Sequence, residues 1–218
     1  MRAIALILLL FPCFVYGQHA YSAPAYGTGT VEVFRNIAGQ PFFPKQYEDV
    51  NGTPFLFDDW ILSSIILNDG RVIKNIRTNF NLVTNELLYQ DEQGKTMVAK
   101  STLVKTVEAG TRKFITTPAR NTYYEVLSTE GKAILLKYYK KVILETKPFN
   151  SATIQKNFMT DESHLLLVGD TITEVKSLKD IYSVIEPSDN LKNFAKQEKL
   201  RSKSVEAWTK VVDYYNSI

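Results

Sequence analysis

Two adjacent aspartates, Asp58 and Asp59, lie beside Trp60 and are the residues whose types and spacing most suggest acid/base chemistry. Two carboxyl groups can hydrolyse a glycosidic bond when they converge on it from about 5 to 9 Å apart. Neighbouring residues of an extended strand point to opposite faces, so these two carboxyls would diverge there. We therefore predict that they open a strand or lie in a turn. Glycan hydrolysis by one of them with a distant glutamate ranks last among the alternatives.

Other catalytic side chains are few in this sequence. Cys13 is the single cysteine, and the two histidines are His19 and His164. His164 stands beside the most apolar run, SHLLLVG, which favours a core or strand-surface histidine over a catalytic base. The sequence has no G-x-S-x-G, no glycine-rich phosphate loop and no H-E-x-x-H. These observations favour a protein that is not an enzyme, with no cofactor and no metal site.

The first residues, MRAIALILLLFPCFVYGQ, have the order of parts of a signal peptide. One basic residue precedes an apolar run from Ala3 to Val15, and Val15 and Gly17 suit a cleavage site. Bulky residues before Cys13 disfavour lipoprotein processing there. No later segment approaches the roughly 20 apolar residues of a membrane-spanning helix. We predict export to the periplasm, the cell surface or the medium, and no transmembrane segment in the mature chain.

Charge gives little reason to expect nucleic acid as a partner. The chain has 26 basic and 23 acidic residues, a net charge of +3. The run LLKYYKK mixes bases with aromatic residues, but in a strand it would place Lys137, Tyr139 and Lys141 together on a solvated face. Its other face would be apolar except for Lys140, with Ile134, Leu136, Tyr138, Val142 and Leu144. A surface for a glycan or polyanion is a weaker alternative.

The clearest fold signal is Asp69-Gly70, a two-residue hairpin turn between two β-prone runs. A second turn is predicted at Thr84-Asn85. The first turn pairs Leu67 with Val72, Ile65 with Lys74, Ser63 with Ile76 and Ile61 with Thr78, and the second pairs Leu82 with Leu87 and Phe80 with Tyr89. One face then carries Ile61, Ile65, Leu67, Val72, Ile76, Phe80, Leu82, Leu87 and Tyr89. The other carries Ser64, Asn75, Arg77, Asn79 and Asn81, with Trp60, Ile66 and Ile73 as apolar exceptions.

The β pattern continues to about residue 176 and then changes to a helical one. Ala133 to Glu145 could be one bent strand or two short ones, while Phe149 to Met159 is ambiguous. After that, Ser177, Ser188 and Ser204 are placed to cap three short amphipathic helices. We predict an α+β protein: an antiparallel β meander, as an open or partly closed sheet or barrel, followed by C-terminal helices. Its parts are a signal peptide (1–17), a flexible leader (18–30), a β-rich domain (31–176) and a helical segment (177–218) packed on or appended to that domain.

Three segments together carry a family resemblance. They are NGTPFLFDDWILSSIILNDGRVIKNIRTNFNLVTNELLYQDEQGK, KSLKDIYSVIEPSDNLKNFAKQEKL and VVDYYNSI. The chain resembles a group of small exported proteins of Bacteroidetes-type bacteria, which share a PFL…W…L(N/D)G hairpin, an NEL strand and a tail ending near YYNS. The resemblance covers most of the mature chain and implies export and a common architecture. It implies no active-site residues.

Two functional hypotheses follow ahead of glycan hydrolysis. The first is an exported, non-enzymatic cell-envelope protein that acts by binding or assembly, with Trp60, Tyr139 and Lys141 as contact residues. The second is a carrier of a lipid or another apolar ligand, because a curved meander under helices can enclose an apolar cavity. Phe80, Leu82 and Tyr89 would help to line that cavity. The expected partner is an envelope protein, or a lipid or glycan ligand.

Overall fold

The computed structural model describes residues 40–41, 47, 49–117, 121–147, 149 and 153–218. The predicted signal peptide and leader, residues 1–30, lie outside this part of the chain. Within it, an antiparallel β meander is followed by three C-terminal helices, which confirms the predicted α+β class.

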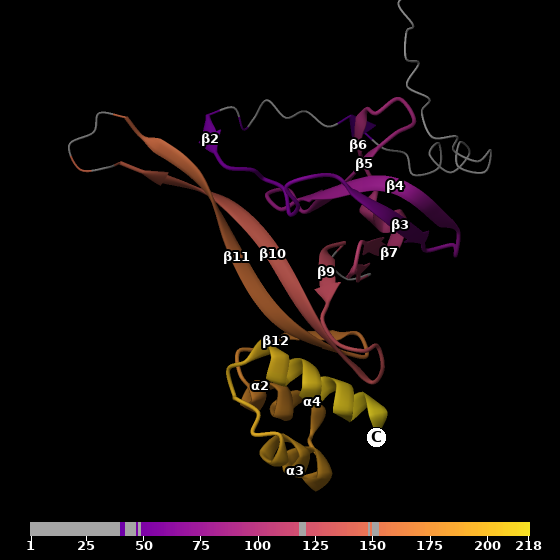
Figure 1. Cartoon of the computed structure of the whole chain (residues 1–218), viewed down its shortest axis with the longest axis vertical. Helices are drawn as coiled ribbons and strands as arrows, with labels where there is room; N and C mark the ends of the chain where they lie inside the picture. Colours follow the sequence, from indigo (N-terminus) through magenta and orange to yellow (C-terminus); the bar gives the residue numbers. More distant parts are fainter. Residues whose placement is uncertain (1–39, 42–46, 48, 118–120, 148, 150–152) are drawn as a thin grey trace, which may run out of the picture.

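Twelve strands of the described chain form one open sheet (Figure 1). Its order is β1-β6-β5-β4-β3-β7-β8-β9-β10-β11-β12, and β2 pairs in parallel with β11. The strands are β1 (Gln40–Pro41), β2 (Val50–Asn51), β3 (Ile61–Leu67), β4 (Val72–Asn81), β5 (Glu86–Gln90), β6 (Thr96–Val98), β7 (Val104–Ala109), β8 (Arg112–Thr116), β9 (Tyr123–Val126), β10 (Ala133–Thr146), β11 (Gln155–Val168) and β12 (Thr171–Glu174). A short 3-10 helix, η2 (Ser101–Leu103), precedes β7.

The longest element is the hairpin of β10 and β11, each of 14 residues. All 14 positions are paired, from Ala133 opposite Val168 to Thr146 opposite Gln155. The segment that could have been one or two strands is thus one strand, and β11 begins inside the ambiguous segment. Figure 1 shows the hairpin running from the helices, past the first strands, to a far end that projects beyond them.

The first hairpin has a longer turn than the sequence predicts. Leu67 N donates to Arg71 O and Gly70 N donates to Leu67 O, so the loop has three residues and ends at Gly70 with φ of +86°. Such loops place glycine in the left-handed region, where it has no steric cost. The predicted pairing of Leu67 with Val72 is therefore wrong by one residue.

A β-bulge then restores the predicted register. Ile65 pairs with Ile73, but Ser63 pairs with Ile76, so one extra residue lies in β4 beside Asn75, whose φ is +58°. A shift of one residue exchanges the two faces of a strand. This is why Val72 is 48% exposed, although it was predicted inside, and why Ile73, predicted on the outer face, is 1% exposed.

The second turn is also longer than predicted, but its error has no effect on which residues are buried. Phe80 pairs with Leu87, and Thr78 pairs with Tyr89, a shift of two residues from the predicted register. A two-residue shift leaves each side chain on its predicted face because side chains alternate with a period of two. Phe80, Leu87 and Tyr89 are accordingly buried.

Two asparagines predicted on the polar face, Asn79 and Asn81, are buried instead. Asn79 Nδ2 donates to Phe57 O at 2.9 Å, and Phe57 N donates to Asn79 Oδ1 at 3.1 Å. Asn81 Oδ1 accepts from Val83 N at 3.0 Å. Buried amides need such partners. The asparagines thus fasten the irregular segment before β3 and the turn after β4, a role that strand alternation does not predict.

The three helices are α2 (Leu178–Ile185), α3 (Asp189–Gln197) and α4 (Val205–Ser217). Each has the predicted serine cap, because Ser177, Ser188 and Ser204 accept bonds from the backbone N–H three residues later. The helices pack on β10 and β11. Their shared core contains Ala133, Leu135, Leu166, Val175, Leu178, Ile181, Ile185, Leu191, Ala195, Trp208, Val211 and Val212.

A separate core lies under the first strands. It contains Ile65, Leu67, Ile73, Ile76, Phe80, Leu82, Leu87, Tyr89, Ala99, Val104, Val107, Ala109, Phe114 and Tyr123. One backbone bond, from Lys141 N to Leu82 O at 2.9 Å, ties β10 to the end of β4. The β10–β11 hairpin therefore joins the two cores, with one at its base and the other beside its middle.

Candidate functional site

The two faces of the β10–β11 hairpin differ in what covers them. Paired residues share a face, and the faces alternate along each strand. We call the packed face the one that carries Leu135, Lys137, Tyr139, Lys141, Phe158, His164 and Leu166. We call the open face the one that carries Leu136, Tyr138, Lys140, Val142, Leu144, Met159, Asp161 and Leu165.

The packed face is covered along most of its length. At the base it meets the helices, where the rings of His164 and Trp208 lie 5.4 Å apart, edge to face. Towards the far end, residues 50–57, which we call the strap, cross it: Lys141 Nζ donates to Thr53 O and to Phe55 O, both at 2.8 Å. Lys141 is thus used to hold the strap.

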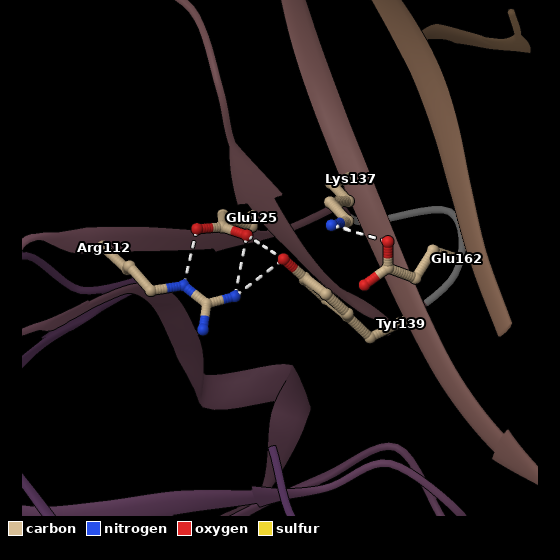
Figure 2. Close-up of polar contacts among 5 residues, drawn as sticks. All are labelled: Arg112, Glu125, Lys137, Tyr139 and Glu162. Carbon is tan, nitrogen blue, oxygen red and sulfur yellow. Dashed lines mark hydrogen bonds and ion pairs between the residues drawn. The ribbon is translucent and has the colours of Figure 1, made fainter. Parts of the chain in front are cut away.

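A polar cluster of Arg112, Glu125 and Tyr139 occupies the middle of the packed face (Figure 2). Arg112 Nε and Nη2 donate to the two oxygens of Glu125 at 2.6 and 2.8 Å. Arg112 Nη2 also donates to Tyr139 Oη at 2.8 Å, and Tyr139 Oη donates to Glu125. The three groups close a triangle contributed by β8, β9 and β10.

Aromatic rings surround the guanidinium of this cluster. Its Cζ lies 5.1 Å from the ring centroids of Phe57 and Phe114 and 5.2 Å from that of Tyr139. Guanidinium groups are attracted to ring faces, and more so where water is excluded. Next to the cluster, Lys137 Nζ bonds Glu162 at 2.8 Å and lies 4.6 Å from the Tyr139 ring centroid (Figure 2).

The cluster keeps its charges at neutral pH. Burial by itself would raise the pKa of Glu125, but the bonds from Arg112 and Tyr139 outweigh it and lower the pKa. Burial and the bond to Glu125 raise the pKa of Tyr139. Burial would lower the pKa of Arg112, yet its bonds to Glu125 raise it. An efficient general acid or base titrates near the working pH. These pKa shifts move each group away from neutrality, so we assign the cluster a structural role.

The open face carries apolar side chains that no described helix or second sheet packs against. Its buried part, Tyr124, Leu136 and Leu165, is surrounded by residues of β8 to β12 alone. The face continues towards the far end through Tyr138 and Val142. There, Leu144 is 44% exposed and Met159 46% exposed. Contiguous exposed apolar surface commonly marks an interaction site.

The sequence predicted the opposite roles for the two faces of β10. Lys137, Tyr139 and Lys141 were expected on a solvated face, but they lie on the packed face and contact Glu162, Glu125 and the strap. The apolar side, including Leu144, is the one left open. The physical reason is that Lys and Tyr carry long apolar stems, which pack well while their polar ends bond elsewhere.

The remaining predicted residues are dispersed. Phe80 and Tyr89 are 3% and 2% exposed in the first core, with the Phe80 ring 4.5 Å from that of Phe114. Trp60 is half-buried before β3. Asp58 and Asp59 are both exposed in the bend that precedes β3, which agrees with the predicted turn or strand-opening role.

Sequence reasoning missed Arg112, Glu125 and Met159. Arg112 and Glu125 are 13 residues apart, and only the register of β8 on β9 brings them together. One signal was present, since Glu125 is an acidic residue inside the aromatic run Tyr123–Val126. A buried charge usually needs a partner, so it could have prompted a search for one. Met159 had no such signal, because its segment was ambiguous.

Among the residues that the structure describes, no group of three or more His, Cys, Asp or Glu side chains could hold a metal ion. None of the helices in that same part of the chain is long and apolar enough to cross a membrane. In comparisons with known proteins, no family model, curated protein or solved structure matches this chain.

Proposed function

We propose that this protein is a non-enzymatic binding protein, and that it docks a protein partner through the open face of the β10–β11 hairpin. One observation carries the proposal. An apolar strip runs from the buried Leu136 and Leu165 to the exposed Leu144 and Met159, on a face that no described helix or second sheet covers.

Two features support a docking role for this face. The packed face is engaged by helices, the polar cluster and the strap, so the hairpin is held from one side. A surface that is already ordered loses less conformational entropy on binding. The predicted signal peptide supports a partner in the cell envelope or outside the cell.

The alternative hypotheses receive less support from the geometry. A lipid carrier would need Phe80 and Tyr89 to line a cavity, but both side chains are buried in the first core, with Phe114 and Tyr123 against Phe80. A glycan hydrolase would need Asp58 or Asp59 in a shaped site. Both are exposed in a bend.

Crosslinking in the native cells tests the proposal with a matched control. The test variant replaces Leu144 and Met159, 44% and 46% exposed, with serine. The control replaces Leu62 on β3 and Val72 on β4, 59% and 48% exposed, with serine on strands that do not pair with the hairpin. The test variant and the control variant therefore remove similar amounts of exposed apolar surface.

We expect a discrete crosslinked species with the wild type and with the Leu62→Ser/Val72→Ser control. It should weaken at least about tenfold with Leu144→Ser/Met159→Ser, since losing two buried contact residues removes well over 1.4 kcal/mol. Equal crosslinking of all three proteins would show that the open face is not the docking surface.

A further inference from the structure

The outer edge of β11 has a gap between its two neighbours. On that edge, β2 pairs with Lys156 and Asn157, and β12 pairs from Leu165 onwards. No described strand pairs with the stretch between Asn157 and Leu165. Met159, Thr160, Asp161 and Glu162 are all exposed in this stretch. An uncovered edge strand is a template for pairing with another chain.

The direction of the backbone groups in the gap can be derived from the hairpin. Lys141 N–H points away from β11, because it donates to Leu82 O. In an antiparallel pair, the residue opposite an outward-pointing one also points outward. Lys141 is opposite Thr160, so Thr160 N–H and C=O point out of the free edge. His164 fits this alternation, since its C=O accepts from Val175 N on the same edge.

The side chains beside the gap select the chemistry of an added strand. Met159 and Asp161 lie on the open face, two residues apart. An added strand places its own side chains next to them on that face. An apolar residue would extend the contact with Met159. Asp161 lies opposite Lys140 on β10, and a basic residue two positions from the apolar one would approach Asp161 from its other side. Glu162, on the packed face, is already bonded to Lys137.

A second copy of this chain fits the edge poorly. Two copies related by a two-fold axis would pair their β11 edges antiparallel. If the two-fold axis lies at Thr160, Asp161 of each copy faces Met159 of the other. If the axis lies at Asp161, the two Asp161 carboxylates face each other, which is unfavourable. Centred on Met159, the pairing would run onto Asn157, where β2 already pairs.

We propose that the gap on β11 accepts an extended segment of the partner, which adds a strand and carries an apolar residue two positions from a lysine or arginine. This deepens the proposed function, on which it rests, by naming the form and charge of the partner segment. Backbone bonds to the edge would supply affinity, while Met159 and Asp161 would supply specificity, as in other strand-addition complexes.

A synthetic peptide, acetyl-TVTITKTV-amide, is the probe, and the full chain is the target. Every second side chain of the peptide is apolar except for one lysine, so it can present that pattern to the open face in either direction. We expect it to slow the amide hydrogen exchange of Thr160 at least about tenfold at saturation. The peptide with glutamate in place of lysine should slow it much less. No slowing with either peptide would overturn the proposal.

Two proline variants test the edge itself. Thr160→Pro removes an N–H that points out of the hairpin, so the ladder with β10 keeps its bonds while the edge is blocked. Ile143→Pro is the matched control, because Ile143 N–H points out of the opposite edge, as Lys141 N–H does two residues earlier. Thr160→Pro should abolish binding of the fluorescently labelled peptide in anisotropy measurements, and Ile143→Pro should retain it. The reverse result would place the added strand on β10 and overturn the proposal.

A charge exchange tests specificity without a proline. Asp161→Lys should bind the glutamate peptide and lose the lysine peptide, and an unchanged preference would contradict the role of Asp161.

The crosslinking experiment separates the two proposals. If Leu144→Ser/Met159→Ser loses the native partner while Thr160→Pro and Asp161→Lys retain it, docking on the open face stands and strand addition falls. If all of these variants retain it, the proposed function falls.

Discussion

The two faces of the β10–β11 hairpin belong to the same two strands, yet they are used in opposite ways. The packed face carries charged and hydroxyl groups, such as Lys137, Tyr139 and Lys141, and it is covered from its base to the strap, while Ile143 beyond the strap contact is 38% exposed. The open face carries Leu144 and Met159, and it is the one that is exposed. Side-chain polarity alone therefore does not tell which face of a long hairpin is inside.

The two faces differ in burial because they differ in the bonding partners that surround them. On the packed face, Lys137 bonds Glu162, Tyr139 bonds Glu125 and Lys141 bonds carbonyls of the strap, so the long apolar stems of these three residues can be buried at little cost. The open face has no covering layer among the described elements. Leu144 and Met159, which are exposed on this face, are thus available for a partner, so the two faces should differ both in what they contribute to stability and in what they bind.

The largest effect is expected from truncating a leucine of the packed face. Leu135 is 0% exposed and belongs to the core shared with the helices. Leu135→Ala should lower the free energy of unfolding by about 3 kcal/mol, because it removes buried methyl groups and leaves a cavity. Urea denaturation followed by circular dichroism measures this change.

Leu144 supplies the matched control on the same strand. It is 44% exposed on the open face, so Leu144→Ala should change the free energy of unfolding by less than about 0.5 kcal/mol. Similar losses for the two variants would mean that the open face is buried in solution. The two faces of the hairpin would then not differ in burial.

A somewhat smaller effect is expected from the polar cluster. Arg112→Met keeps an apolar stem but leaves the nearly buried Glu125 carboxylate without its bidentate partner. Removing one partner of such a pair should cost about 2 to 3 kcal/mol, near the low end for buried pairs because Arg112 is partly exposed. Thermal denaturation of the variant measures the loss.

An exposed arginine with a similar bond is the control for this cluster. Arg71 bonds Asp69 in the first turn, and both side chains are largely in water. Arg71→Met should leave the denaturation midpoint near that of the wild type, since exposed ion pairs contribute little. If Arg112→Met were equally harmless, the cluster would not be what fastens β8 and β9 to the hairpin.

The parts of the fold that sequence could predict are those with a local cause. Ser177, Ser188 and Ser204 each cap a helix, and Asp69-Gly70 lies in a turn, because these residues act on backbone groups a few positions away. The register directly after that turn was predicted wrongly, although Ser63 pairs with Ile76 and Ile61 with Thr78 as predicted. This register depends on a three-residue loop and on a bulge at Asn75, whereas a two-residue turn without a bulge fits the same sequence pattern equally well.

The candidate site depended on contacts that no local pattern encodes. Tyr139 and Lys141 were singled out from the sequence, but as solvent-facing residues. Their actual side follows from Arg112 and Glu125 on β8 and β9 and from the strap, which are remote in sequence. Alternation correctly predicts which residues of β10 share a face. Which of the two faces is covered depends on tertiary packing.

The smallest effect is expected from the titration of His164 on the packed face. Burial lowers its pKa, the nearby charge of Lys137 lowers it further, and Glu162 opposes them. Above the ordinary histidine pKa of about 6.5, both the folded and the unfolded chain hold a neutral imidazole, so stability is unaffected. As the pH falls below that value, the unfolded chain takes up a proton before the folded one does. Stability should therefore decline between about pH 6.5 and the lower folded pKa.

His164→Gln tests this reasoning, because it keeps a polar side chain next to Trp208 without a group that titrates in this range. Urea midpoints measured from pH 8 to pH 5 should fall for the wild type below about pH 6.5 and fall less for the variant. Equal slopes would mean that the imidazole is hydrated in solution. The rings of His164 and Trp208 would then not pack closely in solution, and water would reach the packed face at the base of the hairpin.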